Sequence, residues 1–164
     1  MIQDSLKQYI KSNSHELSYN VLRGMNPEEY QHTTLTCMIR DAMVRKGVDM
    51  GNLGTEVDLL LEGSKIGSTD LVGLAPDGRF VAIQVKTTPE WMIEMKLSDA
   101  EKQMRRDLWY YGNKLELDTI CSTWMFVREW HVKGGPEKQG TLKVYSYHPH
   151  TGSNLVVDEP FYLE

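Results

Sequence analysis

One hairpin signal near the middle of the chain restricts the fold more than any other feature of the sequence. The turn residues Pro76-Asp77-Gly78 separate two apolar runs, residues 69–74 and residues 79–87. Proline and glycine in such a turn, with β-branched residues on either side, indicate two antiparallel strands. Another apolar run, residues 57–61, precedes them across a glycine-containing turn. We therefore expect a meander of three antiparallel strands.

Helical patterns lie on both sides of this meander. Asn26-Pro27-Glu28-Glu29 is typical of a helix start, because it combines an N-cap, a first-turn proline and two carboxylates at the positive end of the helix dipole. Apolar spacing continues to Lys46-Gly47, which ends the helix. A second helix is expected over residues 98–111, with a capping box of Ser98 and Glu101 and a stop at Gly112.

The remaining residues are rich in strand signals. Three β-branched and aromatic runs follow the second helix: residues 119–132, 142–147 and 155–157. A helix between the third and fourth strands permits a parallel crossover. The predicted fold is therefore α/β, a single domain over residues 1–164, in which helices flank a mixed sheet with an αβββαβ core at about residues 27–132. A short helix over residues 2–12 precedes the core, and a β-rich extension over residues 133–164 follows it.

Composition excludes some classes of function. The net charge of −5 and the pI of about 5.6 argue against a protein that holds nucleic acid by bulk charge, though not against a local basic strip. No apolar run approaches the roughly 20 residues of a membrane span. Cys37 and Cys121 are expected to be buried thiols, which suits a reducing cytoplasm.

Three polar residues of the hairpin are expected to converge. If the turn is centred near Asp77, Asp70 falls opposite Gln84 in the register of the two strands. Alternation along a strand places Gln84 and Lys86 on one face and Ile83 and Val85 on the other. Asp70, Gln84 and Lys86 would then meet at one end of a sheet whose other face is apolar.

Such a group suits metal-dependent phosphodiester hydrolysis, which needs a divalent cation on oxygen ligands and an activated water. Asp70 supplies a carboxylate, Gln84 an amide oxygen, and Val85 a main-chain carbonyl. Lys86 can orient or deprotonate the water, or stabilise charge that develops on the phosphate.

The run from Gly67 to Lys86 resembles the PD-(D/E)XK nuclease superfamily, and most closely its VRR-NUC and Holliday-junction-resolvase-like branches. Gln84 stands where the family usually has an acidic residue, and this Q-x-K order is similar to that of Mrr-type nucleases. The resemblance implies a deoxyribonuclease that uses Mg²⁺, with Mn²⁺ able to substitute, and that acts on double-stranded or branched DNA. It also implies a homodimer, and the compact size of the chain suggests an enzyme that acts alone or with a targeting partner protein.

The resemblance further implies an acidic residue on the first helix. Glu29 is our choice, with Glu28 and His32 as neighbours within one turn. Glu56 and Asp58 on the first strand remain alternatives.

Other residues have a packing or surface interpretation beside a functional one. A basic face of the second helix could contact DNA phosphates or simply face solvent: Lys102, Arg105 and Arg106. The larger apolar residues are expected in the core or at an interface: Trp91, Met92, Met95, Trp109, Tyr110, Tyr111 and Trp124.

Three other functions remain open. Gln103 and Tyr110 loosely resemble the helical motif of RecB-like exonucleases. The neutral Gln84 and the acidic pI favour a catalytically degenerate nuclease fold that serves as a DNA-binding or assembly module. A β-rich binding module without nuclease ancestry would not bring Asp70, Gln84 and Lys86 together.

Overall fold

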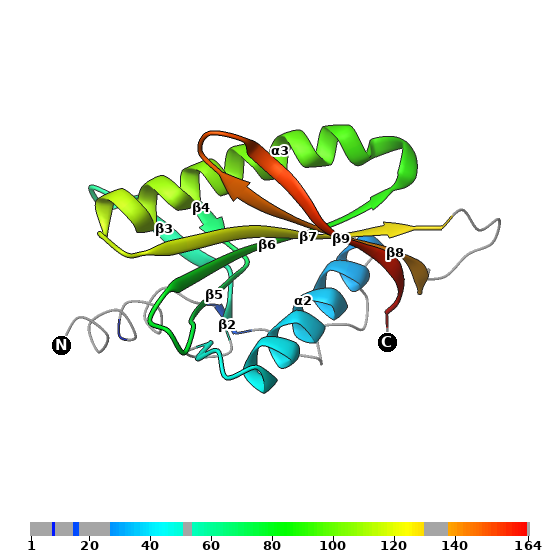
Figure 1. Cartoon of the computed structure of the whole chain (residues 1–164), viewed down its shortest axis with the longest axis horizontal. Coiled ribbons are helices and arrows are strands. Elements are labelled where there is room, and N and C mark those ends of the chain that lie inside the picture. The colour runs from blue at the N-terminus through cyan, green and yellow to red at the C-terminus, as the bar shows by residue number, and fades with distance from the viewer. Residues whose placement is uncertain (1–7, 9–14, 17–26, 51–53, 130–137, 164) are drawn as a thin grey trace.

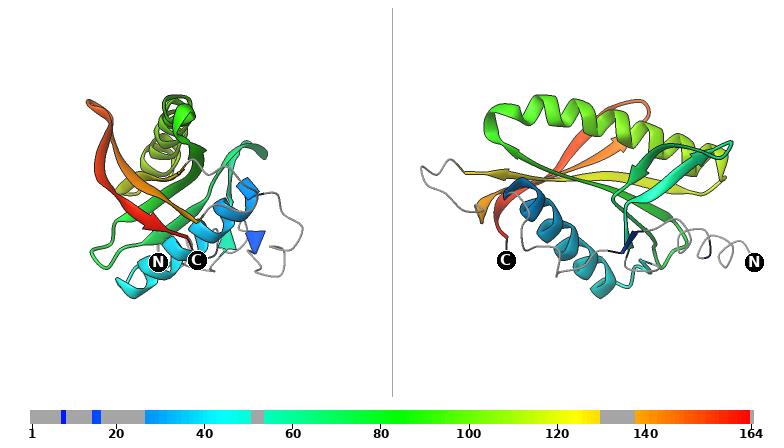
Figure 2. Two further views of the ribbon diagram at one scale, coloured as in Figure 1. Left: turned by 90° about the vertical axis from the view of Figure 1, so that its right-hand side faces the viewer. Right: turned by 180° about the vertical axis from the view of Figure 1, so that it is seen from behind.

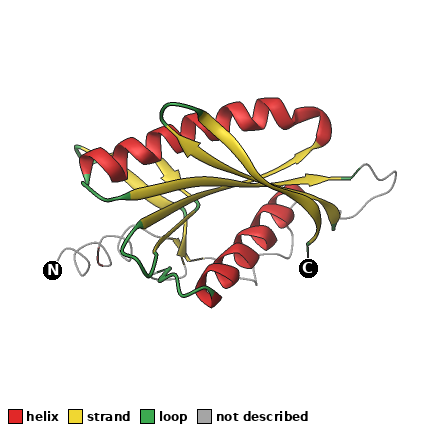
Figure 3. Cartoon of the chain, in the orientation of Figure 1, coloured by secondary structure: helices red, strands yellow, loops and turns green. Residues whose placement is uncertain are grey.

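The computed structural model describes residues 8, 15–16, 27–50, 54–129 and 138–163. They form the predicted α/β fold, in which a mixed five-stranded sheet lies between two helices (Figures 1 and 3). The strands are, in their order across the sheet, β5 (Leu71–Leu74), β6 (Phe80–Pro89), β7 (Thr119–Arg128), β8 (Gln139–His148) and β9 (Gly152–Tyr162). The helix expected over residues 2–12 lies outside the described residues, apart from residue 8.

The strand directions agree with the predicted crossover. β5 pairs with β6 in antiparallel fashion, whereas β6 and β7 are parallel, and β7, β8 and β9 are antiparallel again. The hairpin turn between β5 and β6 contains Gly78 at φ +89°, a conformation that favours glycine. The described part of β7 ends at Arg128, before the predicted limit, and β8 and β9 are longer than expected.

The predicted meander does not form within one sheet. The run 69–74 is interrupted at Asp70, so that β4 (Ser64–Thr69) pairs only with β3 (Val57–Leu61) and β5 pairs with β6. A further short pair joins β1 (His15–Glu16) to β2 (Gly54–Thr55). The chain therefore bends at Asp70 as it passes from the β3–β4 hairpin to the main sheet, and the local pattern of apolar residues could not reveal this.

Helix α2 (Pro27–Arg45) begins and ends where the sequence predicts. Gly47, at φ +85°, follows its last turn and donates its N–H to the carbonyl of Val44 at 3.0 Å. The helix covers one face of the sheet, where Leu35 and Ile39 pack with Ile83 of β6 (Figure 1).

Helix α3 differs from the prediction at both ends. It spans Ile93–Asp107 after a 3-10 turn over Glu90–Met92, so Ser98 lies inside the helix and is not its N-cap. The earlier start follows from tertiary packing, because Ile93 pairs with the core beside β7 and β8. Beyond Asp107 the helix continues as a π-helix over Leu108–Lys114 and does not stop at Gly112.

The two helices lie on opposite faces of the sheet, as Figure 2 shows from two further directions. Between each helix and the sheet lies a layer of buried core residues. Alternate residues of β6 divide between the two layers: Phe80 and Ala82 pack beneath α3, whereas Ile83 and Val85 pack against α2. This alternation is the predicted one, and it places Gln84 on the α3 side of the strand.

The larger side chains, which were expected in the core or at an interface, divide between the core and the surface. Tyr110 and Tyr111 are buried, as predicted. Trp91 and Met95 are 74% and 55% exposed, and Trp109 is 43% exposed, so these three do not belong to the core. They lie on the solvent side of the α3 segment, whose opposite side faces the sheet.

Cys37 and Cys121 are both buried free thiols, as expected. Burial beneath α3 raises the pKa of the Cys121 thiol far above its usual value, and the nearby Asp107 carboxylate adds to this effect. Within the described part of the chain, no helix is long and apolar enough to cross a membrane.

Candidate active site

Asp70 lies at the bend between the two sheets and contacts both. Its main-chain carbonyl accepts a 3.1 Å hydrogen bond from the N–H of Glu56, beside β3. Its side-chain Oδ2 accepts a 2.7 Å hydrogen bond from the N–H of Val85 in β6. The β5–β6 ladder ends at the pair Leu71–Ile83, so Asp70 is next in register to Gln84, as the hairpin predicted.

His32 of α2 approaches Asp70 and the main chain of Val85 from the face of the sheet that α2 covers. Its Nε2 lies 3.0 Å from the carbonyl oxygen of Val85 and 3.7 Å from Oδ2 of Asp70. Burial by itself lowers the pKa of His32, but the interactions with Asp70 and the Val85 carbonyl outweigh burial and raise the pKa above 6.5. The carboxylate of Asp70, the imidazole of His32 and the main-chain carbonyl of Val85 therefore lie close together.

Lys86 follows Val85 on β6 and turns toward α3. Partial burial lowers the pKa of its ammonium group, and the carboxylate of Asp70 opposes this effect. Lys96 and Arg106 lower the pKa further, whereas Asp99 raises it. A lysine with a lowered pKa is a better proton acceptor than an exposed lysine.

Gln84 is 2% exposed and points beneath α3. Its Nε2 donates hydrogen bonds to Oδ2 of Asp107 at 2.7 Å and to the carbonyl of Ser68 at 3.3 Å. The amide nitrogen therefore contacts groups that precede Asp70 in the chain and groups on α3. The amide oxygen is the atom of this side chain that remains for a ligand role.

Asp107 is the main residue of this site that sequence reasoning missed. Its side chain has no exposed surface, and Oδ1 accepts hydrogen bonds from Oγ1 of Thr69 at 3.0 Å and from Nη2 of Arg106 at 3.2 Å. Burial raises its pKa to about 6, although these donors and Gln84 lower it. The helical spacing with the buried Ala100 and Met104 was the signal that could have placed Asp107 on the inner face of α3.

The acidic candidates on the first helix and first strand have different positions. His32 is the α2 residue for which the structure gives a contact with Asp70, and Glu29 is exposed one turn earlier. The side chain of Glu28 lies outside the described residues. Asp58 forms an ion pair with Lys65 at 3.1 Å, and Glu56 is exposed.

The basic residues of α3 do not share one role. Lys102 is exposed, and Arg105 is exposed with its Nε 3.3 Å from the hydroxyl of Tyr147. Arg106 turns inward, where Nη2 donates to the carbonyl of Ser68 at 2.6 Å and to Asp107. Lys102 and Arg105 lie at the surface, where Nη2 of Arg105 is also 3.9 Å from a carboxylate oxygen of Glu101, and Arg106 braces the chain before Asp70.

The donor set can be tested against the cation that the nuclease resemblance implies. Ligand bonds of about 2.1 Å at right angles place neighbouring ligand atoms about 3.0 Å apart. The Nε2 of His32 lies 3.0 Å from the Val85 carbonyl, which matches this spacing and is also the length of a hydrogen bond, and 3.7 Å from Oδ2 of Asp70, which is wider. The donor types, a carboxylate, an imidazole and a carbonyl, suit a divalent cation, which would draw Oδ2 closer to His32. Among the described residues no three or more His, Cys, Asp or Glu side chains are placed so that they could hold a metal ion together, so any cation here relies also on main-chain or amide oxygens and water.

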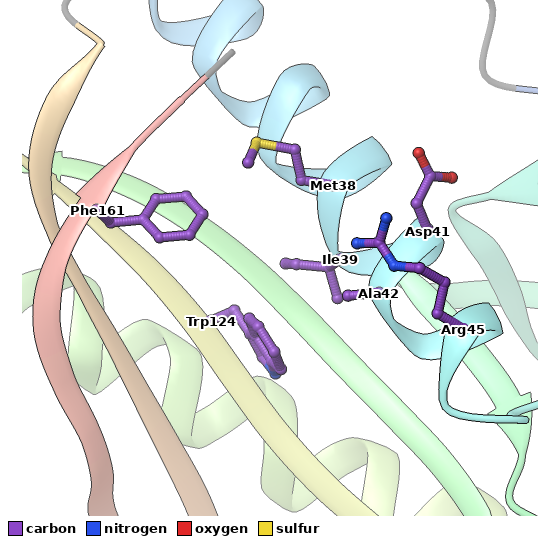
Figure 4. Close-up of a pocket in the computed structure, with 7 residues that line it drawn as sticks. All are labelled: Met38, Ile39, Asp41, Ala42, Arg45, Trp124 and Phe161. Atoms are coloured by element: carbon purple, nitrogen blue, oxygen red, sulfur yellow. The ribbon is translucent and has the colours of Figure 1, made fainter.

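A separate pocket of about 320 Å³ lies between α2 and strands β7 and β9 (Figure 4). It is mostly apolar, with one acidic and one basic side chain at α2. The lining residues are Met38, Ile39, Asp41, Ala42, Arg45, Trp124 and Phe161.

Comparisons with known proteins add no family assignment. No protein-family model matches the chain, and neither curated proteins nor solved structures give a significant match. The function is therefore inferred from the geometry and chemistry of the site.

Proposed function

We propose that this chain is a metal-dependent DNA endonuclease that hydrolyses phosphodiester bonds in double-stranded or branched DNA. The supporting observation is the position of Asp70 at the bend, where its Oδ2 lies 2.7 Å from the main-chain nitrogen of Val85. Val85 directly precedes Lys86 on β6. His32 adds an imidazole 3.0 Å from the Val85 carbonyl. A carboxylate, a carbonyl, an imidazole and a lysine in one place suit hydrolysis of a phosphodiester.

Each of these residues has a separate role in the proposal. Asp70, His32, the carbonyl of Val85 and the amide oxygen of Gln84 would hold a divalent cation, Mg²⁺ with Mn²⁺ able to substitute. Such a cation, when bound, polarises the phosphate and lowers the pKa of a water molecule. Lys86, whose pKa burial lowers, accepts the proton of the attacking water or stabilises the phosphate charge.

The donor set also bears on the choice of cation. Mg²⁺ favours oxygen ligands and usually retains several waters, whereas imidazole suits Mn²⁺ and other transition metals better. With His32 next to a single carboxylate, activity with Mn²⁺ should equal or exceed activity with Mg²⁺.

Cys37 and Cys121 are both free and buried, which fits an enzyme of the reducing cytoplasm.

DNA would lie across the exposed side of α3 near Lys102 and Arg105. Two exposed cations on a chain of net charge −5 give weak attraction to DNA. A homodimer or a partner protein would add contacts, and two copies would also supply one active site for each strand.

The test is cleavage of labelled linear, nicked, single-stranded and four-way-junction DNA with Mg²⁺, Mn²⁺ or EDTA. Wild type is compared with Asp70→Asn and Lys86→Met, and with the matched surface controls Asp118→Asn and Lys46→Met, both of which replace exposed residues. Cleavage should require a cation and be lost only in the two site variants. Cleavage that survives in both site variants would refute the proposal, and digestion only from DNA ends would indicate a RecB-like exonuclease.

A second candidate is a degenerate nuclease fold that binds DNA or assembles with a partner. The neutral Gln84, whose amide nitrogen is engaged by Asp107 and Ser68, favours it, because this leaves Asp70 as the carboxylate of the group around Val85. It predicts DNA binding without cleavage under every metal condition, and no effect of Lys86→Met on function.

A further inference from the structure

We infer that Asp107 is a positioning residue for the proposed cation site. It orients the Gln84 amide so that Oε1, and not Nε2, is presented on the side of Asp70 and Lys86. The inference rests on the proposed function, because it concerns a ligand of the proposed cation. No sequence pattern connects Asp107 with the proposed cation site. The packing of α3 on β6 brings the two together, through the contact between Asp107 and Gln84.

The first argument is the orientation of the amide. Both hydrogen bonds of the Gln84 side chain are donated by Nε2, to Oδ2 of Asp107 at 2.7 Å and to the carbonyl of Ser68 at 3.3 Å. An ionised carboxylate and a carbonyl can only accept hydrogen bonds. A flipped amide would place Oε1 against two acceptors, so this environment selects one orientation and directs Oε1 away from Asp107.

The second argument is that the side chain of Asp107 is held in one orientation. Its side chain has no exposed surface, and Oδ1 is held by Oγ1 of Thr69 at 3.0 Å and by Nη2 of Arg106 at 3.2 Å. The hydroxyl of Tyr111 in turn donates to Oγ1 of Thr69 at 3.0 Å. With Oδ1 held by two donors, Oδ2 faces Gln84.

The third argument is the position of the other contacts along the chain. Nη2 of Arg106 donates to the carbonyl of Ser68 at 2.6 Å, and Asp107 accepts from Thr69. Ser68 and Thr69 are the two residues before Asp70. The same buried group therefore orients Gln84 and braces the segment that presents Asp70.

Taken together, these contacts make hydrogen-bond polarity, and not side-chain volume, the property that matters at position 107. Asp107→Asn keeps the shape but introduces an N–H donor, which can pair with Oε1 of Gln84 and release the constraint on the amide. The double variant Gln84→Glu with Asp107→Asn exchanges the two functional groups. There the introduced asparagine donates to one oxygen of the introduced glutamate, and the other oxygen takes the place of Oε1.

The experiment measures binding of Mn²⁺ alone, without DNA, by electron paramagnetic resonance of free Mn²⁺ and by calorimetry. Thermal unfolding in EDTA checks that each variant is folded, and Asp118→Asn serves as a charge-matched surface control. Residues that orient metal ligands typically change metal affinity by about 10- to 100-fold when mutated. Asp107→Asn should weaken Mn²⁺ binding by about tenfold, and the double variant should restore it to the wild-type value or above.

The possible results separate the inference from the proposed function. If Asp70→Asn binds Mn²⁺ as well as wild type does, or wild type binds none, the proposed cation site is wrong and the inference fails with it. If Asp70→Asn loses Mn²⁺ but Asp107→Asn and the double variant both match wild type, only the inference is overturned. Should Asp107→Asn not fold, Gln84→Met decides, because unchanged Mn²⁺ binding without Oε1 would also overturn it.

Discussion

Oδ2 of Asp70 accepts a 2.7 Å hydrogen bond from the main-chain N–H of Val85 and thereby ties the bend between β4 and β5 to the strand that carries Lys86. Asp70 thus has a structural role, as the acceptor of this hydrogen bond, and a proposed chemical role, as a ligand of the cation. Two substitutions can separate these roles. Asparagine keeps an oxygen acceptor for the N–H but has no charge, whereas alanine leaves the N–H without its acceptor.

We expect Asp70→Asn to change the free energy of unfolding by less than about 1 kcal/mol, and Asp70→Ala to lower it by about 1–3 kcal/mol, since the N–H of Val85 would be left unpaired. Both variants should lose metal-dependent cleavage. Urea unfolding in EDTA measures the first effect and the DNA cleavage assay the second. Equal stability of the two variants would show that the hydrogen bond contributes little.

His32→Glu should shift the cation preference from Mn²⁺ toward Mg²⁺, because a carboxylate replaces the imidazole beside Asp70 and the Val85 carbonyl. Calorimetric titration of both cations gives the ratio of affinities, which we expect to change by about tenfold, equivalent to about 1.4 kcal/mol. Glu29→Gln, one turn away on α2, tests whether an acidic residue of this helix takes part, and Asp118→Asn is the surface control. A larger loss of activity in Glu29→Gln than in His32→Ala would assign the helix position to Glu29.

Asp107 should make stability depend on pH. Its pKa is raised by burial from 3.8 to about 6, so between these values the folded state holds a proton that the unfolded state has released. The stabilisation is full below pH 3.8 and is lost as pH rises through 6, by up to about 3 kcal/mol at 1.36 kcal/mol per unit. The unfolding free energy of wild type minus that of Asp107→Asn, measured in EDTA from pH 4 to 8, should fall by this order. A flat difference would mean that Asp107 has an ordinary pKa.

Gly67→Ala should disturb the Arg106 brace. A methyl group at Gly67 would clash with Nη1 of Arg106, whose Nη2 donates a hydrogen bond to the carbonyl of Ser68. We expect a loss of about 1–3 kcal/mol in the free energy of unfolding, as for other overpacked positions. Gly112→Ala is the control, since its nearest neighbour would be a side-chain carbon of Leu108 at an ordinary 3.5 Å. The two variants are compared by chemical denaturation, and equal stability would show that Arg106 can move at little cost.

Lys102→Ala and Arg105→Ala should each weaken DNA binding and reduce the slope of affinity against salt concentration by about one, because each removes one exposed cation from the proposed phosphate contact. Fluorescence anisotropy at several salt concentrations measures the slope. Lys46→Ala, at the end of α2 and away from α3, should leave the slope unchanged. If all three variants behave alike, DNA does not lie along α3.

Elements whose signals are local could be predicted from the sequence. The turn at Gly78 set the β5–β6 register, so Asp70 could be paired with Gln84 by counting residues from the turn. Alternation along β6 predicted the two faces of that strand, and Pro27 and Gly47 marked the ends of α2. These features depend on backbone conformations that a few neighbouring residues favour regardless of the rest of the chain.

The set of residues around Asp70 depends on tertiary packing and could not be predicted from the sequence. The break of the strand at Asp70 follows from the change of pairing partner there, from β3 before it to β6 after it, and the start of α3 at Ile93 follows from contact with β7 and β8. The approach of His32 from one side of β6 and of Asp107 from the other depends on how two distant helices pack. Such contacts arise from burial and from the need to pair buried polar groups across the whole chain, and no local pattern contains that information.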